Sequence, residues 1–139
     1  MVEKRARKME SAKKDLPKAL HFGDESSKVG IMGIGMNAGV IREALGRVAE
    51  HGVNLHFFQM RTLWPMLDET LEFIEKCEKV YVVEHNATGQ LASILRSCGA
   101  DKEKLISILR IDCTPMRPGE LVGDILEHEG IKLEEVDAA

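Results

Sequence analysis

The sequence predicts a three-layer α/β/α sandwich, in which an open parallel sheet is covered by helices on both sides. The first observation is that strand-like and helix-like segments alternate four times along the 139 residues. The second is that the strand-like segments are apolar on both faces, which is typical of parallel strands between two helical layers. The chain is long enough for one such domain and hardly for two. Its crossovers should be right-handed.

Four short apolar runs predict the strands of the sheet. They cover residues 28–34, 53–60, 79–84 and 105–111. Each run is followed by a segment whose apolar residues recur three and four apart, as on one face of a helix. The expected inward residues are Val40, Ile41, Ala44, Leu45, Val48 and Ala49, then Leu67, Leu71, Ile74 and Cys77, then Leu91, Ile94, Leu95 and Cys98, and finally Leu121, Val122, Ile125 and Leu126.

Glycines and prolines predict where these helices begin and end. Pro65 and Asp68 are expected to open the second helix, and Pro118 fits the first position of the last one. Glycine is common just after a helix, where the chain turns with a positive φ. The glycines that fit such positions are Gly52, Gly99 and Gly130.

The N-terminal segment differs from the rest of the chain. Residues 2–16 are highly charged and rich in helix formers, and Pro17 would stop a helix there. Its large apolar residues lie seven apart, a stripe too thin to hold a helix alone. We therefore expect a linker helix over 1–17 and the α/β domain over 18–139. A basic arm can also bind nucleic acid, but acidic residues are mixed in and aromatic residues are missing, so a solvated helix is favoured.

Composition and spacing narrow the classes of function. No apolar run is long enough to span a membrane and no secretory signal follows the N-terminus, which makes the cytoplasm the expected location. Cys77, Cys98 and Cys113 are far apart, so neither an iron–sulfur cluster nor a structural zinc site is expected. The five histidines also lack metal-ligand spacing: His21, His51, His56, His85 and His128. We expect no metal site.

Ligands of open α/β sheets bind beyond the carboxyl ends of the strands, which directs attention to the loops there. The loop from Gly33 to Gly39 is similar to a dinucleotide-binding turn, because Gly33 and Gly35 have the right spacing. Gly39 comes one residue too late, however, and no acidic residue ends the second strand. A tight strand-to-helix turn through Asn37 is the favoured interpretation.

A second loop joins a carboxylate, an imidazole and an amide. Glu84, His85 and Asn86 follow the third predicted strand and are candidates for acid–base chemistry. The alternative is structural: Asn86 or Thr88 would cap the next helix, and Glu84 would accept hydrogen bonds from backbone amides. Capping is favoured over catalysis.

The turn after the second predicted strand contains the single tryptophan. Trp64 precedes Pro65, and a tryptophan in such a turn is either a lid on the core or an anchor in an interface.

A family resemblance rests on two motifs and their separation in the chain. They are Leu63-Trp64-Pro65 after one strand, and Glu84, Asn86, Gly89, Gln90 and Leu91 after the next. Together they resemble the C-terminal domain of the alpha subunit of 2-oxoacid:ferredoxin oxidoreductases. The segment 29–45 resembles the first strand, glycine turn and helix of that domain, and 1–10 resembles the segment that joins it to the upstream domain. The chain departs from the family at Leu67 and in the stretch Cys113-Thr114-Pro115.

The resemblance implies a fold like the transketolase C-terminal domain, with a mostly parallel five-stranded sheet and one antiparallel strand, for which residues 19–22 are the candidate. It also implies an intact enzyme that oxidatively decarboxylates a 2-oxoacid to an acyl-CoA and reduces ferredoxin. That enzyme uses thiamine diphosphate, Mg²⁺, iron–sulfur clusters and coenzyme A. The implied partners are the pyrimidine-binding domain upstream in the alpha subunit, the beta subunit and a second copy of the chain.

The sequence contains neither a Gly-Asp-Gly…Asn motif for Mg²⁺ and diphosphate nor a cysteine cluster. We therefore expect an excised or separately encoded assembly domain that binds no cofactor and has no catalytic residues of its own. Trp64, Pro65, Glu84, Asn86, Gly89 and Gln90 would shape a turn and an interface, and His85 would be incidental. Two alternatives are an independent nucleotide- or ligand-binding module that uses the Gly33–Gly39 loop and, more weakly, a hydrolase-like enzyme built on Glu84 and His85.

Overall fold

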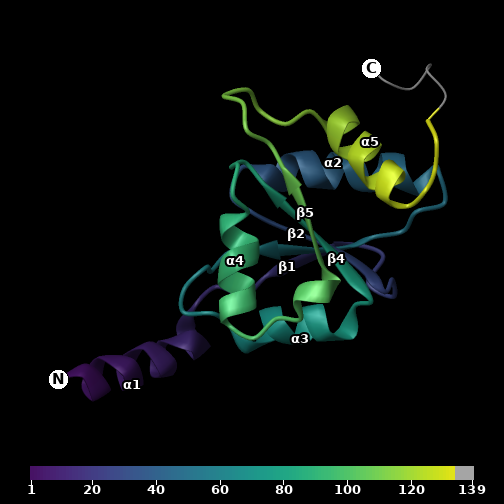
Figure 1. The fold of residues 1–139 in the computed structure, drawn as a ribbon. Coiled ribbons are helices and arrows are strands. Elements are labelled where there is room, and N and C mark those ends of the chain that lie inside the picture. The colour runs from purple at the N-terminus through teal and green to yellow at the C-terminus, as the bar shows by residue number, and fades with distance from the viewer. Residues whose placement is uncertain (134–139) are drawn as a thin grey trace.

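A five-stranded sheet forms the centre of the molecule (Figure 1). The computed structural model describes residues 1–133. The strands are β1 (Leu20–Gly23), β2 (Val29–Ile34), β3 (His56–Met60), β4 (Lys79–Glu84) and β5 (Leu105–Leu109), in the order β1-β3-β2-β4-β5. β2, β3, β4 and β5 are parallel, and β1 runs antiparallel to β3 at one edge. The predicted fold class and its one antiparallel strand are confirmed.

Two helical layers cover the sheet. One face carries α2 (Asn37–Ala49) and α5 (Pro118–His128), and the other carries α3 (Asp68–Lys76) and α4 (Gln90–Ser97) (Figure 1). Neighbouring strand residues enter different cores: Ile31 packs beneath α2 and α5, whereas Met32 packs beneath α3 and α4. Both side chains are fully buried. This two-sided burial explains why the strands read as continuous apolar runs.

Strand ends follow the pairing of the strands rather than hydrophobicity. Residues 53–55 were expected in a strand, but β3 begins at His56, because His56 is the first residue that pairs with both β1 and β2. The last strand was expected to reach Ile111, but it ends at Leu109, which pairs with the last residue of β4. Beyond this point Ile111 is 75% exposed.

The helix after β3 begins later than expected. Pro65 lies outside it, in an irregular turn with a cis Trp64–Pro65 peptide bond, and α3 starts at Asp68. The last helix does begin at Pro118, as the sequence indicated.

The N-terminal helix α1 (Val2–Ala12) projects from the sandwich (Figure 1). None of its residues is buried, and a short 3₁₀ turn (Lys13–Asp15) leads on toward β1. Lys13 forms an ion pair of 3.7 Å with Asp68 at the start of α3. Within the described residues, every helix is too short or too polar to cross a bilayer.

Candidate functional site

The four parallel strands end at one edge of the sheet, which we call the carboxyl edge. The turns after β2, β3, β4 and β5 therefore lie near one another there. The motif residues singled out from the sequence lie in the turns after β2, β3 and β4 or in the strand ends and first helical turns beside them. This is the edge at which open α/β sheets bind ligands.

Glu84 is the last residue of β4 and its side chain is buried. Its Oε1 accepts a hydrogen bond from the backbone N–H of Leu91 at 2.5 Å, and Oε2 accepts one from Ala92 at 3.2 Å. Both amides belong to the first turn of α4, where the helix dipole favours a negative charge. The carboxylate is therefore directed into the protein, against the start of the helix that follows it.

Asn86 completes this arrangement. Its Nδ2 donates to Glu84 Oε1 at 3.0 Å. Its Oδ1 accepts from the backbone N–H groups of Thr88, Gly89 and Gln90 at 3.2, 2.8 and 3.3 Å. Gly89 occupies the N-cap position of α4, and of the two side chains considered as caps it is Asn86 that bonds the turn and the first amide of the helix. Gly89 turns the chain into α4 with a φ of 65°.

His85 has a contact that the sequence did not indicate. Its Nε2 lies 2.8 Å from the backbone oxygen of Asp112, in the loop after β5. The imidazole therefore links the turns that follow two neighbouring strands. His85 was expected to be incidental, and this expectation is corrected, because the residue contacts a neighbouring loop. The sequence did not indicate the contact, since it depends on the order of the strands in the sheet.

The loop after β2 is followed by a polar side chain that also forms its hydrogen bond within the protein. Asn37 is buried and its Nδ2 donates to the backbone oxygen of Val83 at 3.3 Å, which ties the start of α2 to the end of β4. A Cβ on Gly33 would lie 2.6 Å from Ile41 Cδ1, and Gly35 has a φ of 66°. The positive φ of Gly35 therefore favours glycine there, and a side chain at Gly33 would have to displace the terminal methyl of Ile41. Gly39 has open space around it and no positive φ.

The charged residue that opens the loop after β5 is paired within the chain. Arg110 forms an ion pair with Glu120 in the first turn of α5. Glu120 also accepts from the backbone N–H of Arg117 at 2.9 Å. This backbone hydrogen bond, followed by the pairing with Arg110, holds the pKa of Glu120 below its usual value.

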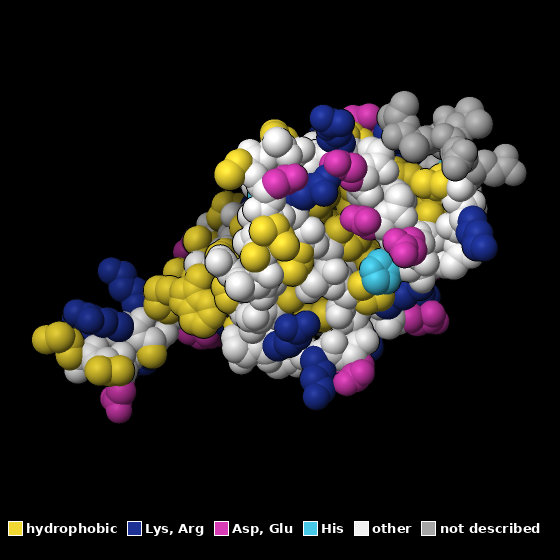
Figure 2. Space-filling model, turned by 45° about the horizontal axis from the view of Figure 1, so that its top comes forward, with side chains coloured by type: hydrophobic (Ala, Val, Ile, Leu, Met, Phe, Trp, Pro, Cys, Tyr) yellow, Lys and Arg dark blue, Asp and Glu magenta, His cyan; other side chains and the backbone are white. Residues whose placement is uncertain are grey.

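Apolar side chains are exposed beside these paired polar groups. Trp64 is 64% exposed in the turn after β3, whereas Pro65 next to it is buried. Trp64 is therefore no lid on the core. Met36 after β2 and Ile111 after β5 are exposed to 74% and 75%. Figure 2 shows hydrophobic side chains at the base of the projecting helix and across the middle of the visible face.

Sequence reasoning identified only one of these exposed apolar residues. Trp64 stood out because it is large and follows a strand. Met36 and Ile111 could not be separated from core residues, since their exposure depends on where the strands lose their partners. The sequence signal that could have found Met36 and Ile111 is their position, since each lies two residues beyond the end of a strand.

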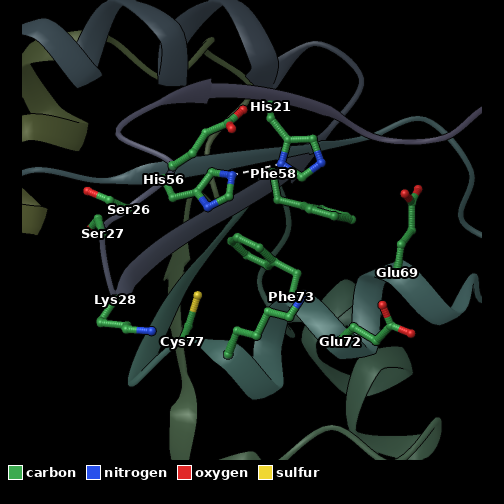
Figure 3. A pocket seen from close by; sticks show the side chains of 12 residues that line it. His21, Ser26, Ser27, Lys28, His56, Phe58, Glu69, Glu72, Phe73 and Cys77 are labelled. Carbon is green, nitrogen blue, oxygen red and sulfur yellow. Dashed lines mark hydrogen bonds between the residues drawn. The ribbon is translucent and has the colours of Figure 1, made fainter.

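A second cluster lies away from the carboxyl edge, in a pocket of about 430 Å³ beside β1 and α3 (Figure 3). Here His21 Nδ1 and His56 Nε2 are 2.8 Å apart. Burial, and then the neighbouring His21, lower the pKa of His56. Sequence reasoning missed this pair, because the two residues are 35 positions apart and meet only through the antiparallel pairing of β1 with β3.

Fold and carboxyl edge together define a class: an α/β/α domain whose buried polar edge groups bond to its own turns and whose exposed edge residues include the apolar Met36, Trp64 and Ile111. Comparison with known proteins gives the family. Residues 27–121 match the model of pyruvate:ferredoxin oxidoreductase core domain II, and the chain belongs to this family. The resemblance drawn from the Trp-Pro turn and the Glu84–Leu91 segment is thereby confirmed.

Curated relatives include alpha subunits from Aeropyrum pernix. The chain is 34% identical over 129 residues to subunit alpha of 2-oxoacid:ferredoxin oxidoreductase 2 of that organism, covering 90% of this chain and 20% of the relative. It is 32% identical over 102 residues to subunit alpha of 2-oxoacid:ferredoxin oxidoreductase 1, covering 68% of this chain and 16% of the relative. The chain thus spans a fifth or less of the curated relatives it matches.

Two solved structures are similar, one as part of a larger chain and the other over nearly its whole length. The 2-oxoglutarate:ferredoxin oxidoreductase from Magnetococcus marinus, solved with 2-oxoglutarate, coenzyme A and succinyl-CoA bound, matches with a TM-score of 0.82 and 30% identity. The match covers 91% of this chain and 22% of that one. The alpha chain of a probable 2-oxoacid ferredoxin oxidoreductase from Thermoplasma acidophilum has a TM-score of 0.50 at 21% identity, covering 81% of this chain and 97% of that one. This second likeness concerns the fold alone.

Proposed function

We propose that this chain is an assembly domain of the alpha subunit of a thiamine-diphosphate-dependent 2-oxoacid:ferredoxin oxidoreductase and has no catalytic activity alone. The observation that carries the proposal is the division of roles at the carboxyl edge. Glu84, Asn86 and Asn37 bond to the chain's own backbone and side chains, whereas Trp64 and Ile111 are exposed beside them. Such an edge suits protein contact better than chemistry.

The whole enzyme would oxidatively decarboxylate a 2-oxoacid to an acyl-CoA and pass the electrons to ferredoxin. Support comes from the named activities of the relatives, which act on 2-oxoacids with ferredoxin. The reaction belongs to the assembled subunits in this proposal, and the present domain contributes surface and support.

The residues present do not fit thiamine diphosphate or its Mg²⁺. A diphosphate site needs carboxylate or amide oxygens that are free to bind the metal. At the carboxyl edge Glu84 and Asn86 already accept hydrogen bonds from the backbone of α4 and its turn. We therefore assign the cofactor, the iron–sulfur clusters and coenzyme A to other parts of the enzyme.

The proposed partners are the pyrimidine-binding domain of the alpha subunit, the beta subunit and a second copy of this chain. Residues 1–17 would act as a linker helix: α1 buries none of its residues, and a helix of this length is marginal in water without a surface to pack on. The enzyme would work in the cytoplasm.

Association measurements test the proposal. Sedimentation velocity of the chain mixed with the remaining alpha-subunit domains and the beta subunit should show a specific complex, and the mixture should oxidise a 2-oxoacid while the chain alone does not. Trp64→Ala and Ile111→Ser should weaken the complex without unfolding the chain, because both side chains are exposed. Glu50→Ala, an exposed change at the far end of α2, is the matched control. A monomer indifferent to the other subunits, or turnover by the chain alone, would contradict the assembly role.

A further inference from the structure

Three potential metal ligands meet at the edge of the sheet where β1 pairs with β3. His21 lies opposite Phe58, so His56 is its diagonal neighbour two residues along β3, on the same face. Figure 3 shows the two imidazole rings with their nitrogens directed at each other across the dashed hydrogen bond. A carboxylate oxygen of Glu25, in the loop between β1 and β2, completes the group. The three ligand atoms lie within 4.8 Å of one another.

We propose that His21, His56 and Glu25 form a binding site for a divalent transition-metal ion of the Zn²⁺ type. Two imidazoles and one carboxylate are a ligand set that zinc uses when a fourth position is left to water. Imidazole nitrogen with carboxylate oxygen selects against Mg²⁺ and Ca²⁺, which prefer oxygen ligands alone. The proposed metal site is independent of the similarity to known oxidoreductases and of the proposed assembly role.

The hydrogen bond between the rings shows that the two nitrogens already face each other at close range. In that bond one nitrogen donates a proton and the other offers a lone pair. A tetrahedral ion that replaces the shared proton would lie off the line between the nitrogens, so each ring has to turn until its lone pair points at the ion. Zn–N bonds of about 2.0–2.1 Å in a tetrahedral site put the two nitrogens about 3.3 Å apart. The observed 2.8 Å therefore has to open by about half an ångström. His21 is exposed and His56 partly exposed, so both rings have room for this adjustment.

Aromatic neighbours hold the two rings in place. The ring of His21 packs edge-on against Phe58, with centroids 5.3 Å apart, and that of His56 packs edge-on against Phe73, at 5.0 Å. Phe58 and Phe73 are themselves stacked at 4.7 Å and buried. Supporting contacts of this kind fix ring orientation, which is what a metal site needs from its surroundings.

Charge around the pocket also favours a cation. Its charged lining residues are Glu25, Glu69, Glu72, Lys28 and Lys76. Three carboxylates against two ammonium groups leave one net negative charge, which attracts a cation. Cys77 lines the same pocket, but it is not among the three ligands that cluster.

Binding would tie the edge of the sheet together. β1 pairs with the sheet through four residue positions on one side only, and Glu25 belongs to an exposed loop. An ion held by β1, β3 and this loop would cross-link all three. An ion that binds only the folded chain stabilises it by mass action, so the melting temperature should rise with metal concentration.

Calorimetric titration of the untagged, chelator-treated chain with ZnCl₂ at neutral pH tests the site. We expect saturable one-to-one binding with micromolar affinity and a rise in melting temperature. His21→Ala and His56→Ala should each lose both effects, and Glu25→Gln should weaken the binding. Titration with Co²⁺ should produce visible absorption bands of a site with nitrogen ligands, and these should vanish in the same variants.

His51→Ala is the matched control, because it removes a partly buried histidine outside the cluster and should leave binding unchanged. Circular dichroism of each variant without metal shows whether it still folds, and imidazole NMR shifts of His21 and His56 on adding Zn²⁺ report the site in the unmodified chain. The proposal is overturned by the absence of saturable binding, by binding that survives either histidine substitution, or by zinc-induced shifts confined to other histidines.

Discussion

At the scale of single residues, the carboxylate of Glu84 illustrates how a polar group can be buried at little cost. Its charge faces the first turn of α4, where the backbone N–H groups of Leu91 and Ala92 have no partner within the helix. Asn86 adds a side-chain donor on one side and caps the same helix on the other. The motif that suggested an active site therefore stabilises the start of α4. Its residues Glu84 and Asn86 are linked by a hydrogen bond.

Replacing Glu84 by Ala should destabilise the fold strongly. Two buried amides would lose their acceptor, at about 1–3 kcal/mol for each. Asn86→Ala should cost about 1–2 kcal/mol as the loss of a cap, and His85→Ala should cost less because its hydrogen bond is exposed. Urea unfolding of each variant measures these differences.

The matched control for Glu84 is Glu78→Ala, an exposed residue just before the same strand. If Glu84→Ala were no more harmful than Glu78→Ala, the hydrogen-bonded network would contribute little to stability. A Glu84→Gln variant keeps one acceptor oxygen and should fall between the two.

At the scale of elements, the sequence predicts the core of each strand and helix better than its ends. The apolar runs and the spacing of Ile41, Ala44 and Val48 suffice to recognise β2 and α2, because those side chains pack where periodicity places them. The ends depend on partners. β5 stops at Leu109 because β4 has ended, and no local property of Ile111 records this.

The turn into α2 allows a test with two glycines four residues apart. Gly35→Ala should destabilise the chain by about 1–2 kcal/mol, because its φ of 66° is unfavourable for a residue with a Cβ. Gly39→Ala should instead stabilise it by roughly 0.5–1 kcal/mol, because Gly39 is exposed in the first turn of the helix and a Cβ there meets open space. Thermal and urea unfolding provide the measurement. Effects of the same sign at both positions would contradict this description of the turn.

At the scale of the whole molecule, what the sequence could not predict is the meeting of distant residues. The motif residues at the carboxyl edge could be grouped from the sequence, because the loops after parallel strands meet at one edge of the sheet. That rule holds whatever the register between the strands. The pair of His21 and His56 requires the edge strand, its antiparallel direction and its register. A register shift of one residue would move one histidine to the other face of the sheet.

A further long-range contact makes global stability depend on pH. Glu129, just after α5, accepts a hydrogen bond from the buried Tyr81 of β4 and forms an ion pair of 2.7 Å with Lys79. Burial opposes ionisation of Glu129, but the hydrogen bonds from Lys79 and Tyr81 outweigh it and lower its pKa. Burial, and then Glu129 itself, raise the pKa of Tyr81.

The sign of the pH effect follows from this lowered pKa. An unfolded chain holds Glu129 at its ordinary value of 4.5, and the folded chain holds it below that. The stabilisation is therefore fully present above about pH 4.5 and is lost as the pH falls through the lower, folded value. Above that range the contact holds the end of α5 against β4.

Glu129→Gln should therefore lower the free energy of unfolding at pH 7 by about 1.5–3 kcal/mol, the range for hydrogen bonds to a charged group. The deficit relative to the unmodified chain should shrink steadily below pH 4.5, where the carboxylate that Gln replaces becomes protonated. Urea unfolding at a series of pH values measures this difference, in which the titration of all other carboxylates cancels. Glu127→Gln, an exposed change on the same helix, should show no such trend. A deficit that stays constant from pH 7 to pH 3 would mean that packing, rather than charge, holds Glu129 in place.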